Sequence, residues 1–312
     1  MADLEKRALG VLGPEVSVVG LGCNNFGRRV DLDGTRAVLD TALEQGITFL
    51  DTADIYGSPH GHSEEFLGDV LQGRRDHVVL ATKFGMDMGD GRGPRGSPAY
   101  IRQAIEASLR RLRTDVIDYY WYHEPDGVTP IGDTLETLDE LVRAGTVRWI
   151  GASNFSAEQI EEADAVARDR GLTRFTAIQN HYSLLVREPE REVLPTCERL
   201  GLGFVPFFPL ASGLLTGKFH RGEPAPAGTR LSERSEVATE EQFDVVEALE
   251  QYAAAREVTI IDVAIGALLA RTPVTTVIAG ATKPEQVRAN VAAGRWKPDD
   301  NDMAELEELL NQ

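Results

Sequence analysis

Four ionisable side chains of different types stand where short apolar runs end. Asp51, Lys83 and His123 close the second, third and fourth of these runs, and Tyr56 lies in the loop after Asp51. A tyrosine titrates near ~10, and a neighbouring ammonium group lowers that pKa by stabilising the phenolate. Asp51 would hold the ammonium of Lys83, while His123 would donate a hydrogen bond to a substrate oxygen. The set therefore predicts proton transfer through Tyr56, although each residue alone also suits a structural turn or strand end.

The elements that must position these residues follow a regular alternation. We expect strands at 18–21, 48–50, 78–81, 116–122, 147–151, 176–178, 203–205 and 276–278. We expect helices at 35–45, 63–71, 99–112, 134–143, 157–170, 190–200, 241–256, 261–271 and 284–292. Crossover helices let consecutive strands run parallel, so eight such units predict an α/β fold, a (β/α)8 TIM barrel with a parallel eight-stranded sheet. A doubly wound sheet is the alternative.

Three further features concern the organisation of the chain. A short hairpin is expected before the barrel, from Arg7–Leu9 through the Gly13-Pro14 turn to Val16. No shift in composition divides the sequence, so we expect residues 1–312 to form a single domain. The segment 220–240, rich in proline, glycine, serine and charge, is predicted to be a flap over one face.

Charge and apolar patterning exclude two classes of partner. The chain has 32 basic and 50 acidic residues, a net charge of −18 spread along its length, which repels phosphate backbones and anionic lipid. No apolar run approaches the roughly 20 residues of a membrane span. We therefore expect neither a nucleic-acid nor a membrane partner, and nothing in the sequence indicates an oligomeric state.

The cysteines and the first residues bear on the compartment. Cys23 and Cys197 are the only cysteines, which predicts neither a disulfide framework nor a thiolate metal cluster. The opening MADLEKRALG lacks the apolar core of a secretory signal, and it carries acidic residues that mitochondrial presequences avoid. We expect a cytoplasmic protein.

Several motifs resemble those of one family, in order along essentially the whole chain. They are DTADIYG at 51–57, SEEFLG at 63–68, TKFG at 82–85, the run 115–120 leading to His123, GASNF at 151–155, QNHYSLL at 179–185 and PLASGLLTGK at 209–218. Together they are similar to the signature of the aldo/keto reductases. That resemblance implies a (β/α)8 barrel that binds a nicotinamide cofactor without a Rossmann domain. Consistently, no Gly-x-Gly-x-x-Gly fingerprint joins a strand to a helix.

The resemblance also implies roles for individual residues. The catalytic tetrad would be Asp51, Tyr56, Lys83 and His123, with Tyr56 as the general acid in reduction of a small-molecule carbonyl substrate. Phe207 would stack on the nicotinamide, and Ser153, Asn154 and Gln179 would hold its carboxamide, with Gly22, Cys23 and Asn24 nearby. The pyrophosphate would lie along Leu210, Ser212, Gly213 and Leu214, next to Pro209 and Lys218. The adenosine end would be surrounded by Gly280, Thr282, Lys283, Gln286 and Asn290.

Lys283 bears on the choice of cofactor. It precedes the helix expected at 284–292, where a helix N-terminus favours an anion, so it can pair with a ribose 2′-phosphate. We therefore expect NADP(H) in preference to NAD(H), and no metal. Asn25, Phe26, Trp121 and Glu124 are expected to shape the substrate pocket.

The sequence departs from the family pattern at several positions. Phe208 stands where the family commonly has serine, and Ala279 where it often has proline. Glu124 adds a negative charge beside His123, which is expected to disfavour acidic substrates, and residues around Ser58-Pro59-His60 lengthen the loop after Tyr56.

Parts of the sequence are compatible with three other functions. A metal hydrolase would use His60 and His62 near Asp54, but the flanking glycines and proline predict a loop without further ligands. A glycosidase would pair Asp51 with Glu124, but Lys83 would keep Asp51 ionised and leave no clear acid. The third is a cofactor-binding, redox-sensing regulatory subunit without significant turnover; the complete tetrad favours an enzyme instead.

Overall fold

Eight parallel strands form the central sheet of the protein. The structure is a computed structural model that describes residues 4–226, 229, 232 and 238–311. The strands are β3 (Val19–Gly22), β4 (Phe49–Asp51), β5 (Val79–Phe84), β6 (Ile117–Tyr122), β7 (Val147–Ser153), β8 (Ala177–Gln179), β9 (Gly203–Phe204) and β10 (Val277–Gly280). Neighbours pair in the order β10-β3-β4-β5-β6-β7-β8-β9. Parallel bridges from Phe204 to Val274 and from Phe207 to Ile278 then join the two ends. The sheet closes on itself, which confirms the (β/α)8 prediction over a doubly wound sheet.

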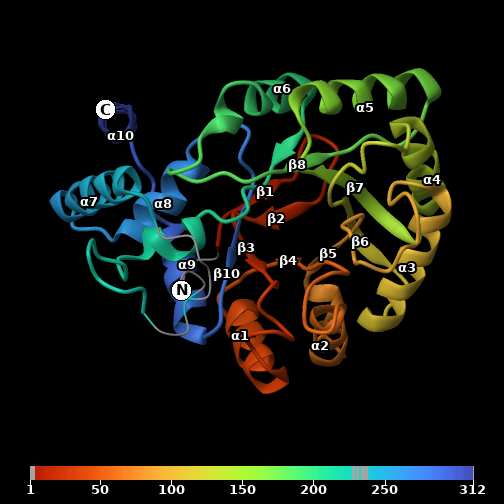
Figure 1. The fold of residues 1–312 in the computed structure, drawn as a ribbon, viewed down its shortest axis with the longest axis horizontal. Helices are drawn as coiled ribbons and strands as arrows, with labels where there is room; N and C mark the ends of the chain where they lie inside the picture. Colours follow the sequence, from red (N-terminus) through yellow and green to blue (C-terminus); the bar gives the residue numbers. More distant parts are fainter. Residues whose placement is uncertain (1–3, 227–228, 230–231, 233–237, 312) are drawn as a thin grey trace.

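Helices surround this sheet (Figure 1). They are α1 (Leu32–Glu44), α2 (His62–Val70), α3 (Pro98–Leu112), α4 (Ile131–Arg143), α5 (Ala157–Arg170), α6 (Val193–Leu200), α7 (Glu240–Ala255), α8 (Ile260–Leu269), α9 (Pro284–Ala293) and α10 (Asp300–Leu310). Local signals set several boundaries: Ser156 and Gln159 form a capping box at the start of α5, and Gly171 ends that helix with a φ of 63°. The sequence prediction did not include α10, although Met303, Leu306, Leu309 and Leu310 recur at helical spacing and pack on the core.

The predicted hairpin closes one end of the barrel. Strands β1 (Lys6–Ala8) and β2 (Glu15–Ser17) pair antiparallel, as expected. Leu9 and Val16 from this hairpin pack with Phe49, Tyr119 and Trp121 in a cluster inside the barrel. Because apolar side chains fill this end, the interior is accessible only from the carboxyl ends of the strands.

Side-chain alternation determines which residues reach that open end. Successive residues of a strand point to opposite faces, so Asp51 shares the inward face with Phe49, two residues earlier. Lys83 likewise follows the inward Ala81, and Gln179 follows the inward Ala177. The polar residues at the strand ends therefore converge on the barrel axis above the apolar cluster.

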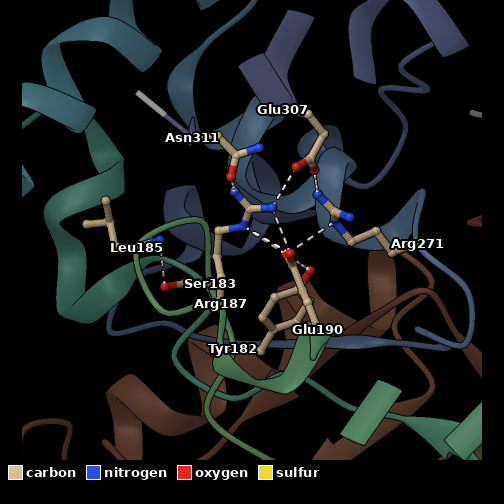
Figure 2. A network of polar contacts seen from close by, with 8 residues as sticks. All are labelled: Tyr182, Ser183, Leu185, Arg187, Glu190, Arg271, Glu307 and Asn311. Atoms are coloured by element: carbon tan, nitrogen blue, oxygen red, sulfur yellow. Dashed lines mark hydrogen bonds and ion pairs between the residues drawn. The ribbon is translucent and has the colours of Figure 1, made fainter. Parts of the chain in front are cut away.

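A polar network attaches the last helix to the loop after β8 (Figure 2). Glu190, in the short helix η2 (Glu188–Glu190), accepts hydrogen bonds from Tyr182 at 2.7 Å and from Arg187 at 2.7 Å. Arg187 also binds Glu307 of α10 at 2.6 Å, and Glu307 pairs with Arg271. The pKa of Glu190 is lowered because these hydrogen bonds and charges outweigh its partial burial. The network therefore holds the loop, the end of α8 and α10 together.

We expect Glu190→Gln to lower the free energy of unfolding by roughly 1–3 kcal/mol, because two arginines and a tyrosine lose a shared charged acceptor. Urea titration at neutral pH measures this change. Glu161→Gln is the control: its pair with Arg199 is exposed, so its loss should cost less than about 0.5 kcal/mol. Equal effects of the two substitutions would contradict the proposed role of the network.

Candidate active site

A cavity of about 640 Å³ opens at the carboxyl ends of the strands. Asp51, Tyr56 and His123 line it, together with Phe207 and Gly280 from the ends of other strands. Lys83 is fully buried directly behind Asp51 and Tyr56. The structure thus brings the four predicted catalytic residues together, with Asp51, Tyr56 and His123 on the cavity wall and Lys83 behind it.

Lys83 is the centre of this group. Its Nζ forms an ion pair with Oδ2 of Asp51, donates to the carbonyl oxygen of Thr52 at 3.0 Å and lies 3.5 Å from Oη of Tyr56. Asp51 is 2% exposed, and its other oxygen accepts a hydrogen bond from Nε2 of Gln179 at 3.0 Å. Each buried charge therefore has several partners, as a buried ion pair requires.

The pKa values of these groups define their protonation states. Burial would lower the pKa of Lys83, but Asp51 and Tyr56 outweigh burial, and the pKa is raised. Burial also raises the pKa of Tyr56, because it outweighs the opposing charge of Lys83. The expectation of a lowered tyrosine pKa is therefore not met: Tyr56 is a neutral phenol, able to donate its proton.

His123 lies beside Tyr56 at the cavity. Their rings meet edge to face, with centroids 5.9 Å apart. Burial and the charge of Lys83 hold the pKa of His123 well below its usual range, so the imidazole is neutral at neutral pH. Its carbonyl oxygen accepts from Nδ2 of Asn154 at 2.9 Å, which fixes the end of β6 to that of β7. His123 is thus a neutral, fixed hydrogen-bonding group beside the phenol.

Most residues predicted to contact a cofactor line the same cavity. They are Gly22, Cys23, Asn24, Asn154, Gln179, Phe207, Pro209, Leu210, Ser212, Gly213, Lys218, Gly280, Thr282, Gln286 and Asn290. Three lie elsewhere. Ser153 is fully buried and Leu214 packs in the hydrophobic core, while Lys283 is the exposed N-cap of α9. None of these three belongs to the cavity wall.

The cavity wall also contains residues that were not predicted from the sequence. Among them are Arg29, Met86, Phe219, Ile261 and Glu285. Arg29 lies in the loop between β3 and α1 and Met86 in the loop after β5, while Phe219, Ile261 and Glu285 come from the segment between β9 and the start of α9, so no motif marks them. Of the residues expected to shape the substrate pocket, Asn25 lines the cavity, whereas Phe26 and Trp121 are fully buried in the cores.

Aromatic rings and closely packed backbone shape two regions of the cavity. Phe207 stacks on His181 with ring planes 13° apart, and Phe208 meets both rings edge to face. At the other region, a Cβ on Gly280 would lie 3.2 Å from Nδ2 of Asn25, so the loop after β3 approaches the end of β10 closely. A flat aromatic face, a cavity of about 640 Å³ and donor side chains such as Asn154 and Lys218 together fit a nucleotide cofactor.

Comparison with known proteins agrees with this geometry. The model of the Aldo/keto reductase family matches residues 18–311. The chain belongs to the aldo/keto reductase family. A protein of Bacillus subtilis (strain 168) named Uncharacterized oxidoreductase YrpG is 38% identical over 300 residues, which cover 93% of this chain and 91% of that protein. This aldo/keto reductase is accordingly an oxidoreductase.

Other residues of this aldo/keto reductase bear on the alternatives. His62 begins α2 and stacks on Phe66, and within the described ranges no group of three or more His, Cys, Asp or Glu is placed to hold a metal ion. None of the helices in the described part of the chain is long and apolar enough to cross a membrane.

Asp54 is a second buried carboxyl group close to the catalytic loop. Its backbone N–H donates to the carbonyl oxygen of Lys83 at 3.1 Å, while its side chain is 2% exposed and Oδ1 has no hydrogen-bond partner among the described residues. Burial and the charge of Glu64 raise its pKa to about 8, against the opposing charge of Arg111. Asp54 is therefore mostly protonated at neutral pH.

We expect Asp54→Asn to remove a pH dependence of stability. The folded protein holds the Asp54 proton up to about pH 8, whereas the unfolded chain releases it near ~4. Stability should therefore fall as pH rises through this interval and level off above it. Relative to the wild type, the free energy of unfolding of Asp54→Asn should therefore increase progressively toward pH ~8. Urea titrations at several pH values across the interval measure this difference. Asp33→Asn, at an exposed pair with Arg36, is the control and should leave the slope unchanged; parallel curves for wild type and Asp54→Asn would contradict the expectation.

Proposed function

We propose that this aldo/keto reductase uses NADP(H) to reduce an aldehyde or ketone reversibly to the alcohol, with Tyr56 as the general acid. The observation that carries the proposal is the placement of Lys83 Nζ between the carboxylate of Asp51 and the hydroxyl of Tyr56, at the wall of a cavity of dinucleotide size. The oxidoreductase class of the family agrees with it.

The chain's own residues would supply the proton chemistry. When bound, the nicotinamide supplies the hydride that reduces the carbonyl carbon. Tyr56 is protonated at rest, so it can donate to the carbonyl oxygen, and Lys83 at 3.5 Å stabilises the phenolate that remains. His123, as a neutral imidazole, would orient and polarise the same oxygen. In the reverse direction the phenolate would accept the alcohol proton.

The cavity wall suggests how a cofactor would be held. Phe207, supported from behind by His181, would stack on the nicotinamide, and Asn154 and Gln179 would bind the carboxamide. Ser212, Gly213 and Lys218 would surround the pyrophosphate, and Gln286 and Asn290 the adenosine. We further propose a single-domain, cytoplasmic enzyme that acts on a small carbonyl substrate and has neither a nucleic-acid nor a membrane partner.

We expect Tyr56→Phe to lower kcat for carbonyl reduction about 10²–10⁴-fold while the Kd for NADPH changes little, because only the proton donor is lost. The absorbance of the reduced nicotinamide, followed over a panel of aldehydes and ketones of graded size and polarity, measures turnover. Tyr252→Phe is the matched control: it removes a hydroxyl that donates to the backbone carbonyl oxygen of Asp302 and does not line the cavity, and it should leave kcat unchanged.

Two outcomes would change the proposal. Undiminished turnover in Tyr56→Phe would exclude Tyr56 as the general acid. Tight NADPH binding without turnover of any carbonyl in the panel would instead favour a redox-sensing regulatory subunit. A parallel titration with NADPH and NADH tests the cofactor, and stronger binding of NADH would overturn the choice of NADP(H).

A further inference from the structure

A second cavity adjoins the first at its far end. Its volume is about 510 Å³, and its wall is formed by residues 27–31 of the loop between β3 and α1, by Gly34 and Phe66, and by Thr282. We call it the side cavity. Arg29 and Thr282 line both cavities, so the two share a boundary at these residues. A ligand extending along the main cavity to Thr282 therefore meets the mouth of the side cavity.

Two arginines line the side cavity. They are Arg28 and Arg29, and among the described residues of its wall the one acidic side chain, Asp31, accepts a hydrogen bond from the N–H of Gly34 as the N-cap of α1. Lys283, which the sequence suggested as the phosphate ligand, lines neither cavity. In a chain of net charge −18, two guanidinium groups on one small cavity are a local exception.

The loop that carries both arginines is fixed. The backbone N–H groups of Arg28, Arg29 and Val30 all donate to the carbonyl oxygen of Asn25, at 3.3, 2.9 and 3.0 Å. Gly27 has a φ of 70°, and a Cβ there would lie 2.5 Å from Cβ of His62, so the loop packs directly on α2. Both guanidinium groups therefore extend from a pre-organised backbone, which limits the entropy lost on binding.

We propose that Arg29, assisted by Arg28, binds a phosphate monoester in the side cavity, namely the ribose 2′-phosphate of the cofactor. The proposal rests on the proposed function, which places the adenosine beside Thr282, Gln286 and Asn290. A 2′-phosphate next to Thr282 would lie against Arg29, whose planar guanidinium suits a phosphate through paired N–H···O bonds. Arg29, and not Lys283, would then determine the preference for NADP(H).

The test measures binding, so it does not depend on turnover. Calorimetry gives the Kd of 2′,5′-ADP and of 5′-AMP, which differ by the 2′-phosphate, and nicotinamide fluorescence gives the Kd of NADPH and NADH. The variants are Arg29→Ala, Arg29→Gln and Arg28→Ala, with Lys283→Ala as the competing assignment. Arg36→Ala is the matched control, an exposed arginine of α1 that pairs with Asp33. Thermal unfolding verifies that each variant is folded.

Both Arg29 variants should weaken 2′,5′-ADP and NADPH at least about tenfold while changing 5′-AMP and NADH less than about twofold, because one charged phosphate contact is removed. Arg28→Ala should cause a smaller loss of affinity for 2′,5′-ADP and NADPH, and Arg36→Ala should leave these affinities unchanged. Inorganic phosphate should compete more strongly with 2′,5′-ADP than with 5′-AMP, because 2′,5′-ADP has the additional 2′-phosphate.

The proposal would be overturned if the Arg29 variants lost affinity equally for 2′,5′-ADP and 5′-AMP, or equally for NADPH and NADH. It would also be overturned if Lys283→Ala, and not the Arg29 variants, selectively lost affinity for the 2′-phosphorylated ligands. A wild type that binds 2′,5′-ADP no better than 5′-AMP would overturn it even if carbonyl reduction is found. An increase of KM for a phosphorylated aldehyde in Arg29→Ala, with 2′,5′-ADP binding intact, would assign the cavity to substrate and overturn it as well. Selective binding without any turnover would support the phosphate site and refute the proposed reaction.

Discussion

The ion pair between Asp51 and Lys83 is the constraint on which the open end of the barrel depends. Both side chains are out of water, and an ion pair without water is stable only when each charge has further partners. Those partners come from three different places: the carbonyl oxygen of Thr52, the amide of Gln179 and the hydroxyl of Tyr56. The register of β4, β5 and β8 and the path of the loop after β4 are therefore all required by one interaction.

The two ends of the barrel surround this ion pair differently: one end is filled by apolar side chains, and the other opens into the cavity. Below it, the hairpin and the inward side chains of the strands fill the interior, so water has no path from that end. Above it, the phenol and the imidazole form the boundary with the cavity. Burial therefore has opposite consequences for neighbouring groups: it keeps the proton on Tyr56 and keeps a proton off His123, whereas Lys83 keeps its charge because Asp51 outweighs burial.

The sequence predicted what depends on strand periodicity and missed what depends on packing between distant segments. Asp51, Lys83 and His123 could be placed because each ends an apolar run, and parallel strands end at the same edge. The position of Lys283 could not be predicted, because its neighbour Thr282 faces the cavity while Lys283 points to solvent. The place of Arg29 in the cavity wall could not be predicted, since only the folded loop brings it beside Thr282. Helix α10, in contrast, could have been predicted from the helical spacing of its apolar residues, which pack on the core.

The closure of the sheet has a consequence for how the chain is made. The first barrel strand, β3, has the last one, β10, as its neighbour, with Val19 opposite Val277. While the protein emerges from the ribosome, the free edge of β3 stays without its partner until more than 250 residues have followed it, since 277 − 19 = 258. An unpaired strand edge invites association with other chains. This edge of β3 is therefore exposed to other chains during synthesis until β10 has emerged and paired with it.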